Sequence, residues 1–346
     1  MVCPLPWIPP DCSGKLPGKR RSAVCSVQRR WGGTPMRRIA VTGAAGLIGR
    51  KLLDHLAADP EIEEVVALDL RDPEIAAEKV RFVRHDVREP MGEIFREHGV
   101  DAAVHLAFLV DPSYDRERER EINVGGTQRF LEACDAVGVG AALLASSATV
   151  YGAWPDNPPL IPEDYPLRGK PGFPYVEDKL ELEAMAARYG DEHPGCRVLL
   201  IRPTVVMGPR MDNYLSRFFL RPVAFRIAGA NPPVPVVHED DVAEATWRIL
   251  KEAPAGPYNL NSGEGVPLLE ALAMMGRKVI PLPAGLLKAL AGAAWALHLR
   301  ALSEVPPAMT DYIRWPWTAD GTRVERETSF RYRFTARAAM ESFVRR

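Results

Sequence analysis

From residue 36 onward, short apolar runs alternate along this chain with amphipathic stretches. The apolar runs predict strands at 39–42, 65–69, 80–83, 102–107, 142–146 and 197–201. Apolar positions spaced three and four apart predict helices between them, at 47–58, 91–98, 117–137 and 175–189. Strands that alternate with helices are typical of an α/β fold with a doubly wound parallel sheet. In such a sheet the ligand crevice lies at the carboxyl ends of the strands.

Two segments stand apart from this pattern. Residues 1–35 mix Pro, Cys, Gly and Arg without periodicity and lack the apolar core of a secretory signal, so we expect a disordered extension. Met36 is then a candidate start, and a targeting role is the lesser alternative. Residues 280–299 are largely apolar and about long enough to span a bilayer. Because Lys288 and His298 interrupt them, we expect a buried or partner-packing helix, ahead of a membrane contact or an apolar wall for a substrate.

Composition narrows the classes of protein. The 346 residues carry 44 Lys and Arg against 45 Asp and Glu, so charge gives no reason to expect nucleic acid or an anionic membrane as partner. The five cysteines show neither the spacing of a metal site nor that of a disulfide framework, which favours a reducing, cytoplasmic compartment. We expect no metal. The acidic residues after His238 are predicted to cap a helix that begins at Val242.

A glycine-rich turn joins the first predicted strand to the first helix. Gly43 permits a tight turn, Gly46 lets the backbone approach a pyrophosphate, and Gly49 lets the helix pack closely. Leu47 and Ile48 open the helix, whose N-terminal N–H groups would face the phosphates. The glycines are spaced three and three, so the common dinucleotide fingerprint is matched only loosely.

Acidic residues follow the second and third predicted strands. Asp69 ends the second strand, where a carboxylate would accept hydrogen bonds from the adenosine ribose and repel a 2'-phosphate. This favours NAD over NADP, although Arg71 would favour the phosphate. Asp86 and Val87 are candidates to flank the adenine ring.

Three residues carry candidate redox chemistry. Lys179 lies one helical turn after Tyr175, and Ser147 follows the fifth predicted strand. The charge of Lys179, with that of an oxidised nicotinamide, would lower the pKa of Tyr175 and make it a proton acceptor. Ser147 would hydrogen-bond the substrate oxygen and hold it in line for hydride transfer.

With these motifs, residues 36–346 resemble an extended short-chain dehydrogenase/reductase of the NAD-dependent epimerase/dehydratase family. Further matching segments are 105–107, 123–127, 146–152, 202–204, 238–243 and 258–260. The resemblance implies a Rossmann-type domain at 36–205 that binds NAD and carries the catalytic residues. It also implies a smaller C-terminal substrate lobe at 206–346, with some segments returning to the first domain.

The resemblance assigns site residues by position. It implies Ser147, Tyr175 and Lys179 as the catalytic triad. The implied cofactor-binding positions are Gly43, Gly46, Leu47, Ile48, Gly49, Asp69, Asp86, Val87, Leu106, Ala107, Tyr175, Lys179 and Pro203. By analogy with relatives, it also implies a homodimer paired through the helices at 117–137 and 175–189.

Departures from the family limit the reaction. Dehydratases of this family carry an Asp-Glu pair after the catalytic serine, and this chain has Ala148 and Thr149 there. Val205 stands where sugar-nucleotide epimerases usually have asparagine, and residues 230–237 lack the arginine that pairs with a diphosphate. Arg210, Arg217 and Arg221 are candidates to replace that arginine.

We therefore expect an NAD-dependent oxidoreductase acting on a small molecule, with epimerisation of a sugar or sugar nucleotide through a transient ketone as the leading reaction. A net dehydrogenase or reductase of a less polar, sterol-like alcohol is the alternative. A non-catalytic NAD-binding sensor is the third hypothesis, and the intact Ser147, Tyr175 and Lys179 argue against it.

Overall fold

The computed structural model describes residues 36–300 and 302–345. Its centre is a seven-stranded parallel sheet in the order β11-β6-β5-β4-β1-β2-β3. The predictions for residues 1–35 lie outside the described residues. In chain order the strands of this sheet are β1 (Arg38–Thr42), β2 (Glu64–Asp69), β3 (Val80–Arg84), β4 (Ala102–His105), β5 (Ala141–Ala145), β6 (Arg197–Pro203) and β11 (Gly256–Leu260).

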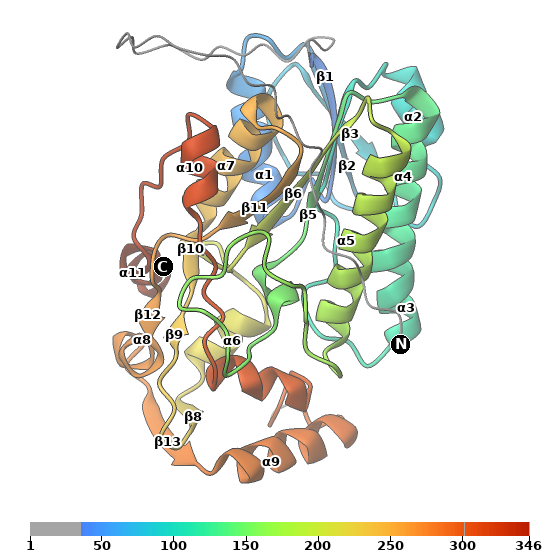
Figure 1. Ribbon diagram of the computed structural model, residues 1–346. Helices are drawn as coiled ribbons and strands as arrows, with labels where there is room; N and C mark the ends of the chain where they lie inside the picture. The colour runs from blue at the N-terminus through green and yellow to red at the C-terminus, as the bar shows by residue number, and fades with distance from the viewer. Residues whose placement is uncertain (1–35, 301, 346) are drawn as a thin grey trace, which may run out of the picture.

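Helices cover both faces of this sheet, which confirms the predicted doubly wound architecture (Figure 1). On one face α1 (Leu47–Ala58) packs against α7 (Glu239–Glu252), and on the other α4 (Gly126–Val137) lies between α2 (Gly92–Glu97) and α5 (Pro174–Glu192). Alternate residues of each strand feed the two layers. Ile39 and Val41 therefore join the core beneath α1 and α7, whereas Ala40 joins the core beneath α4.

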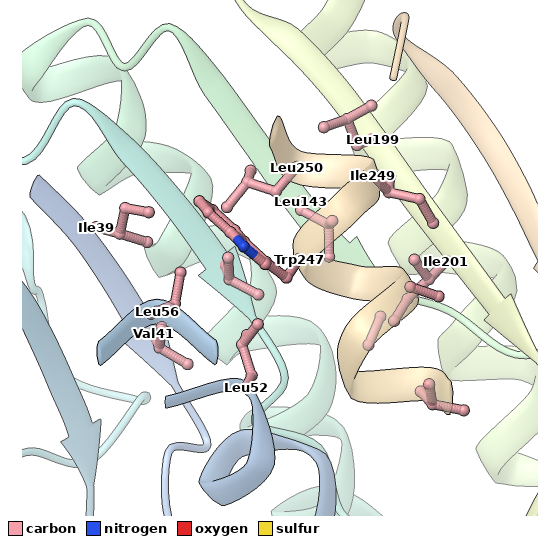
Figure 2. Packing of buried hydrophobic residues seen from close by; sticks show 14 of the residues in the cluster. Ile39, Val41, Leu52, Leu56, Leu143, Leu199, Ile201, Trp247, Ile249 and Leu250 are labelled. Atoms are coloured by element: carbon pink, nitrogen blue, oxygen red, sulfur yellow. The ribbon is translucent and has the colours of Figure 1, made fainter. Parts of the chain in front are cut away.

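Trp247 of α7 is the largest side chain in the core beneath α1 and α7. It is 5% exposed and lies among Leu52, Leu56, Leu143 and Leu250 (Figure 2). An indole buried between two helices and the sheet contributes several kilocalories per mole of apolar burial, so it fixes α7 against α1.

One predicted helix is interrupted. The pattern at 117–137 resolves into α3 (Arg116–Arg120), a π-helical turn at Glu121–Gly125 and then α4. Within this turn the buried Asn123 accepts a hydrogen bond from the Leu109 N–H and donates one to Asp178. The turn thus rotates Asn123 toward the loop that follows β4, an arrangement that a uniform 3.6-residue repeat does not show.

The C-terminal lobe consists of three two-stranded pairings with helices around them. The pairings join β7 (Val205–Met207) to β10 (Val236–His238), β9 (Pro233–Val234) to β12 (Val266–Pro267), and β8 (Val223–Ile227) to β13 (Lys278–Leu282). The helical segments are α6 (Tyr214–Leu220), α8 (Leu268–Met274), α9 (Ala284–Ala296), a 3-10 helix at Pro307–Ile313, α10 (Thr322–Glu327) and α11 (Ala336–Val344). Strand β11 returns to the large sheet beside β6, and α10 packs on β11 (Figure 1).

Two sequence predictions in this lobe need correction. The apolar stretch 280–299 is the end of β13 followed by α9, and only Leu287 and Ala294 of α9 are buried. Of the two predicted forms the buried helix is therefore wrong, whereas the partner-packing helix stays a prediction. Helix α7 begins at Glu239 rather than Val242, and His238 itself is the cap, since its Nδ1 accepts a hydrogen bond from the Asp240 N–H. No helix within the described ranges has both the length and the apolar character that crossing a bilayer requires.

Candidate active site

The glycine-rich turn lies at the carboxyl end of β1 and is built by backbone contact. Gly43 has φ +71°, and its carbonyl accepts a hydrogen bond from the Gly46 N–H at 3.0 Å. A Cβ on Gly43 would lie 2.5 Å from the Ala107 nitrogen, and a Cβ on Gly49 would lie 2.2 Å from the Gly43 oxygen. Both distances are shorter than packed atoms tolerate, so these two positions require glycine.

Helix α1 begins directly after this turn. Its N-cap is Gly46, and no side chain caps its first N–H groups, which are the groups that an anion binds at a helix N-terminus. Leu47 and Ile48 are half-buried at this end. The cradle therefore fits a pyrophosphate in shape and in polarity.

Asp69 ties the end of β2 to the glycine-rich turn. Its Oδ2 accepts a hydrogen bond from the Ala45 N–H at 3.0 Å, and its Oδ1 accepts one from the Arg71 N–H at 3.1 Å. The carboxylate is thus fixed beside the pyrophosphate cradle, where an adenosine ribose would lie.

Asp86 and Val87, the predicted neighbours of the adenine, lie in the loop after β3. Arg88 donates to both carboxylate oxygens of Asp86, and this hydrogen bonding lowers the pKa of Asp86. Val87 is buried against Gly126, where a Cβ would lie 2.9 Å from Val87 Cγ2. Asp86 is consequently an ionised, rigidly held acceptor.

Ser147 and Tyr175 meet at the carboxyl end of β5. A hydrogen bond joins their side chains, although Ser147 comes from the β5 loop and Tyr175 from the first turn of α5. Ser147 Oγ also accepts hydrogen bonds from the Thr149 N–H at 3.2 Å and from the Thr149 hydroxyl at 2.9 Å. The two hydroxyls that sequence analysis singled out are therefore adjacent and oriented.

Lys179 lies one turn further along α5, beneath Tyr175. Its Nζ donates to the Ala145 carbonyl at 2.5 Å and lies 3.3 Å from the ring centroid of Phe108. The Phe108 ring also meets the Tyr175 ring edge-on at 5.6 Å. Phe108 was missed by sequence analysis, because nothing in its local pattern marks it as a neighbour of α5.

The electrostatics of this pair differ from the sequence argument. Burial raises the pKa of Tyr175 to about 12, which the hydrogen bond from Ser147 only partly opposes. Burial also lowers the pKa of Lys179 to about 7, against the opposing charges of Glu183 and Asp178. Desolvation disfavours both charged forms, so in this protein Lys179 alone does not lower the pKa of Tyr175.

A buried polar network supports the serine loop from behind. Ser146 donates to Glu183, Glu183 accepts two hydrogen bonds from Arg202 at 2.7 Å each, and Arg202 donates to the Tyr151 hydroxyl. The Tyr151 hydroxyl donates in turn to Asn259 at 2.8 Å. Because every one of these groups has a partner, the network holds the loop rigidly.

His105 and Pro203 lie in buried surroundings near the glycine-rich turn and the end of β6. His105 is 1% exposed, hydrogen-bonds with Thr42 and Thr127 and has its pKa lowered to about 3 by burial, so it is neutral. Pro203 is buried at the end of β6, where it pairs with Leu260 of β11. Leu106 and Ala107 form the loop that packs on Gly43.

Two of the three arginines predicted to bind a diphosphate form ion pairs within the protein. Arg217 pairs with Asp111 and Glu304, and Arg221 pairs with Glu304, whereas Arg210 is exposed. Val205, the other departure, is 6% exposed and packs in the core that joins the two lobes. In the part of the chain that the structure describes, no three His, Cys, Asp or Glu side chains gather as a metal site requires.

Sequence analysis did not identify the residues that surround Tyr175. A pocket beside Tyr175 is lined by Ser113, Glu119, Phe173 and Trp295, which come from the loop after β4, α3, the start of α5 and α9. Trp295 also contacts the Tyr114 ring, at 4.5 Å between centroids. These residues are far apart in the sequence, and only the closed fold brings them together.

Comparisons with known proteins agree with this geometry. Residues 39–261 match the family described as NAD dependent epimerase/dehydratase. An uncharacterised Mycobacterium tuberculosis protein is 30% identical over 317 residues, 89% of this chain and 83% of that protein. The GDP-6-deoxy-D-mannose reductase of Pseudomonas aeruginosa is 28% identical over 261 residues, 69% of this chain and 79% of the reductase.

A solved structure shows the same fold. The Thermus thermophilus UDP-glucose 4-epimerase in complex with NAD superposes with a TM-score of 0.69 at 24% identity, over 89% of this chain and 98% of the epimerase. With the family match over residues 39–261, this confirms the predicted fold and resemblance. The chain belongs to the NAD-dependent epimerase/dehydratase family of enzymes.

Proposed function

We propose that this protein epimerises a sugar nucleotide through a transient ketone. The observation that carries the proposal is the Ser147–Tyr175 hydrogen bond at the carboxyl end of β5, with no acid–base pair beside it. Ala148 is fully buried and the Thr149 hydroxyl is directed to Ser147, so neither can deprotonate a sugar carbon for loss of water. Oxidation of a ring hydroxyl and reduction from the opposite face need only one tyrosine.

The cofactor roles follow from position and are part of the proposal. Gly43, Gly46, Leu47, Ile48 and Gly49 cradle the pyrophosphate, and Asp69 accepts hydrogen bonds from the adenosine ribose. Asp86 and Val87 flank the adenine. Leu106, Ala107 and Pro203 lie near the nicotinamide, whose ribose hydroxyls Tyr175 and Lys179 hold. The fixed Asp69 carboxylate supports NAD rather than NADP.

The protein's own groups then move the proton. When bound, NAD supplies the hydride acceptor and a positive charge. Tyr175 accepts the proton of the substrate hydroxyl and later returns it, while Ser147 holds the substrate oxygen by a hydrogen bond. A cationic ring beside Tyr175 favours the phenolate and opposes the burial that raises its pKa.

Isotope retention tests this proposal. The purified protein is incubated with UDP-glucose or GDP-mannose that carries deuterium at a single ring carbon, and products are followed by NMR. Epimerisation through a ketone predicts an epimer that keeps the deuterium, with no free NADH. Exchange of the label with solvent, or NADH formed in proportion to product, would contradict an epimerase.

The nicotinamide content of the freshly purified protein gives a second test. An epimerase regenerates its cofactor in every turnover, so we expect nearly one NAD per chain to survive gel filtration. Protein that is empty and binds NAD weakly would favour a dehydrogenase or reductase, and NADP would overturn the role of Asp69.

Net reduction is the second candidate function. Phe173 and Trp295 give the pocket an apolar lining, which favours a less polar substrate group than a pyranose, and a GDP-6-deoxy-D-mannose reductase is among the relatives. A non-catalytic sensor would bind NAD without turnover of any of these compounds. Formation of a labelled epimer in the isotope experiment separates the epimerase from the other two candidates.

Assembly and compartment are further parts of the proposal. The homodimer expected through α3, α4 and α5 is tested by light scattering, with twice the chain mass as the supporting result. Cys134 and Cys196 are both free thiols, which supports the cytoplasmic compartment expected from the cysteine spacing.

A further inference from the structure

The pocket beside Tyr175 contains one charged side chain, that of Glu119, among the residues that line it. Its other walls include Pro112, Phe173 and Trp295. Apolar walls exclude water and strengthen any hydrogen bond made inside them. A carboxyl group in such a place needs an explanation.

Glu119 is almost completely buried and incompletely paired. It is 1% exposed, and within the described residues its Oε2 has no hydrogen-bond partner. Arg116 lies 3.7 Å from Oε1, but its guanidinium is directed to Asp178, to which it donates twice at 2.7 and 2.5 Å. The neighbouring cation therefore does not satisfy Glu119.

The fold itself does not require a carboxyl group at this position. Leucine would fill the same space on α3 without leaving a polar atom buried and unpaired. Burial also raises the pKa of Glu119 to about 7, with Arg116 and the Ser113 backbone opposing it and Asp178 and Glu177 adding to it. A group with this pKa both accepts and donates hydrogen bonds near neutral pH, and perturbed carboxyls of this kind gather at functional sites.

We propose that Glu119 is a substrate-binding residue whose carboxyl group hydrogen-bonds a hydroxyl of the sugar held beside Tyr175. The inference rests on the proposed function and adds a specificity to it. A neutral sugar satisfies the unpaired oxygen, whereas an acidic sugar places a second carboxylate against Glu119. The site therefore selects neutral hexoses over uronic acids.

Calorimetry on the NAD-loaded protein tests this specificity. The probes are two pairs, UDP-glucose with UDP-glucuronic acid and GDP-mannose with GDP-mannuronic acid. Wild type is compared with Glu119→Gln, Glu119→Leu and the matched control Glu117→Gln, which changes an exposed carboxylate on the same helix. We expect wild type and the control to prefer the neutral sugar of the bound pair by roughly ten- to a hundredfold.

The two Glu119 variants separate hydrogen bonding from charge. Glu119→Gln keeps the hydrogen bond and loses the charge, so it retains the neutral sugar and no longer rejects the acidic one. Glu119→Leu loses affinity for the neutral sugar, while its melting temperature rises because an unpaired buried carboxyl is gone. A purely structural residue would instead lower the melting temperature in Glu119→Leu.

Two results would overturn the inference in distinguishable ways. Unchanged sugar preference in both Glu119 variants, with wild-type binding intact, refutes the role of Glu119 and leaves the proposed function standing. Failure of the wild type to bind any of the four sugar nucleotides refutes the proposed function, and the specificity falls with it.

Discussion

The glycine-rich side of the site and the α9 side differ in what positions their groups. On the first side, backbone groups do so: the Gly46 N–H donates to the Gly43 carbonyl, and the Ala45 N–H donates to the Asp69 carboxylate. On the second side, Ser113, Glu119 and Trp295 meet through tertiary packing of separate segments. The geometry of the first side depends on backbone contacts, whereas that of the second depends on individual side chains.

Substitution of Tyr175 should have the largest effect on turnover. We expect Tyr175→Phe to lower kcat by roughly 10²- to 10⁴-fold, because Tyr175 is the group that takes the substrate proton in the proposed mechanism. The NAD content should stay unchanged. Turnover is measured with the deuterated sugar nucleotides, and Tyr189→Phe, on the same helix, is the matched control. Full activity in Tyr175→Phe would refute the catalytic role.

The carboxylate of the glycine-rich side should decide coenzyme choice. Asp69→Ser removes the charge that repels a 2'-phosphate, so we expect the NAD to NADP affinity ratio to fall by roughly tenfold or more. Fluorescence titration with both nucleotides measures the ratio. An unchanged ratio of NAD to NADP affinity would mean that a group other than Asp69 recognises the 2'-position of the adenosine ribose.

The glycine-rich side should also be intolerant of a single methyl group. Gly49→Ala places a Cβ 2.2 Å from the Gly43 oxygen, and overpacking of this kind costs about 1–3 kcal/mol. We expect weaker NAD binding and a lower melting temperature. Gly285→Ala, in α9, meets nothing within 4 Å, so it should leave NAD binding intact and stabilise the protein slightly. Equal changes in NAD binding and melting temperature in Gly49→Ala and Gly285→Ala would contradict the difference between the two sides.

A substitution on the α9 side should weaken substrate binding and leave NAD binding unchanged. Trp295→Leu removes an aromatic wall of the pocket and should raise KM about threefold to tenfold, as loss of part of an apolar contact does. The affinity for NAD should not change. A loss of NAD from this variant would show that α9 also supports the cofactor side.

The smallest effect expected is a pH-dependent difference in stability. The pKa of Glu119 is raised from 4.5 to about 7 in the folded protein, so the folded state holds its proton longer than the unfolded state and wild-type stability falls as pH rises between these values. The charged groups around it are Arg116, Asp178 and Glu177. Glu119→Gln should therefore gain about 5 °C in melting temperature relative to wild type as the pH rises from 5 to 8. A constant difference across this range would contradict the raised pKa.

Features defined by neighbouring residues could be predicted from the sequence, whereas features defined by distant contacts could not. The bounds of α1, Leu47–Ala58, agree with the prediction residue for residue, because a glycine turn and an apolar repeat define them locally. The π-helical turn around Asn123 was missed because its cause is two hydrogen bonds to distant segments. Phe108 and Glu119 were missed because their neighbours in the site also come from distant parts of the sequence. The burial that raises the pKa of Tyr175 in the protein without NAD was also missed, because no local sequence pattern shows how deeply a side chain is buried.

The network behind Ser147 has a consequence for how the protein is made. Its last member, Asn259, lies on β11, more than one hundred residues after the serine loop that it supports through Tyr151. While the chain is being synthesised, the nucleotide-binding strands can pair long before Asn259 leaves the ribosome. The catalytic loop acquires its full set of partners only when β11 is added to the edge of the sheet beside β6. The order of synthesis therefore leaves the support of Ser147 to a strand that is made after the first six strands of the sheet.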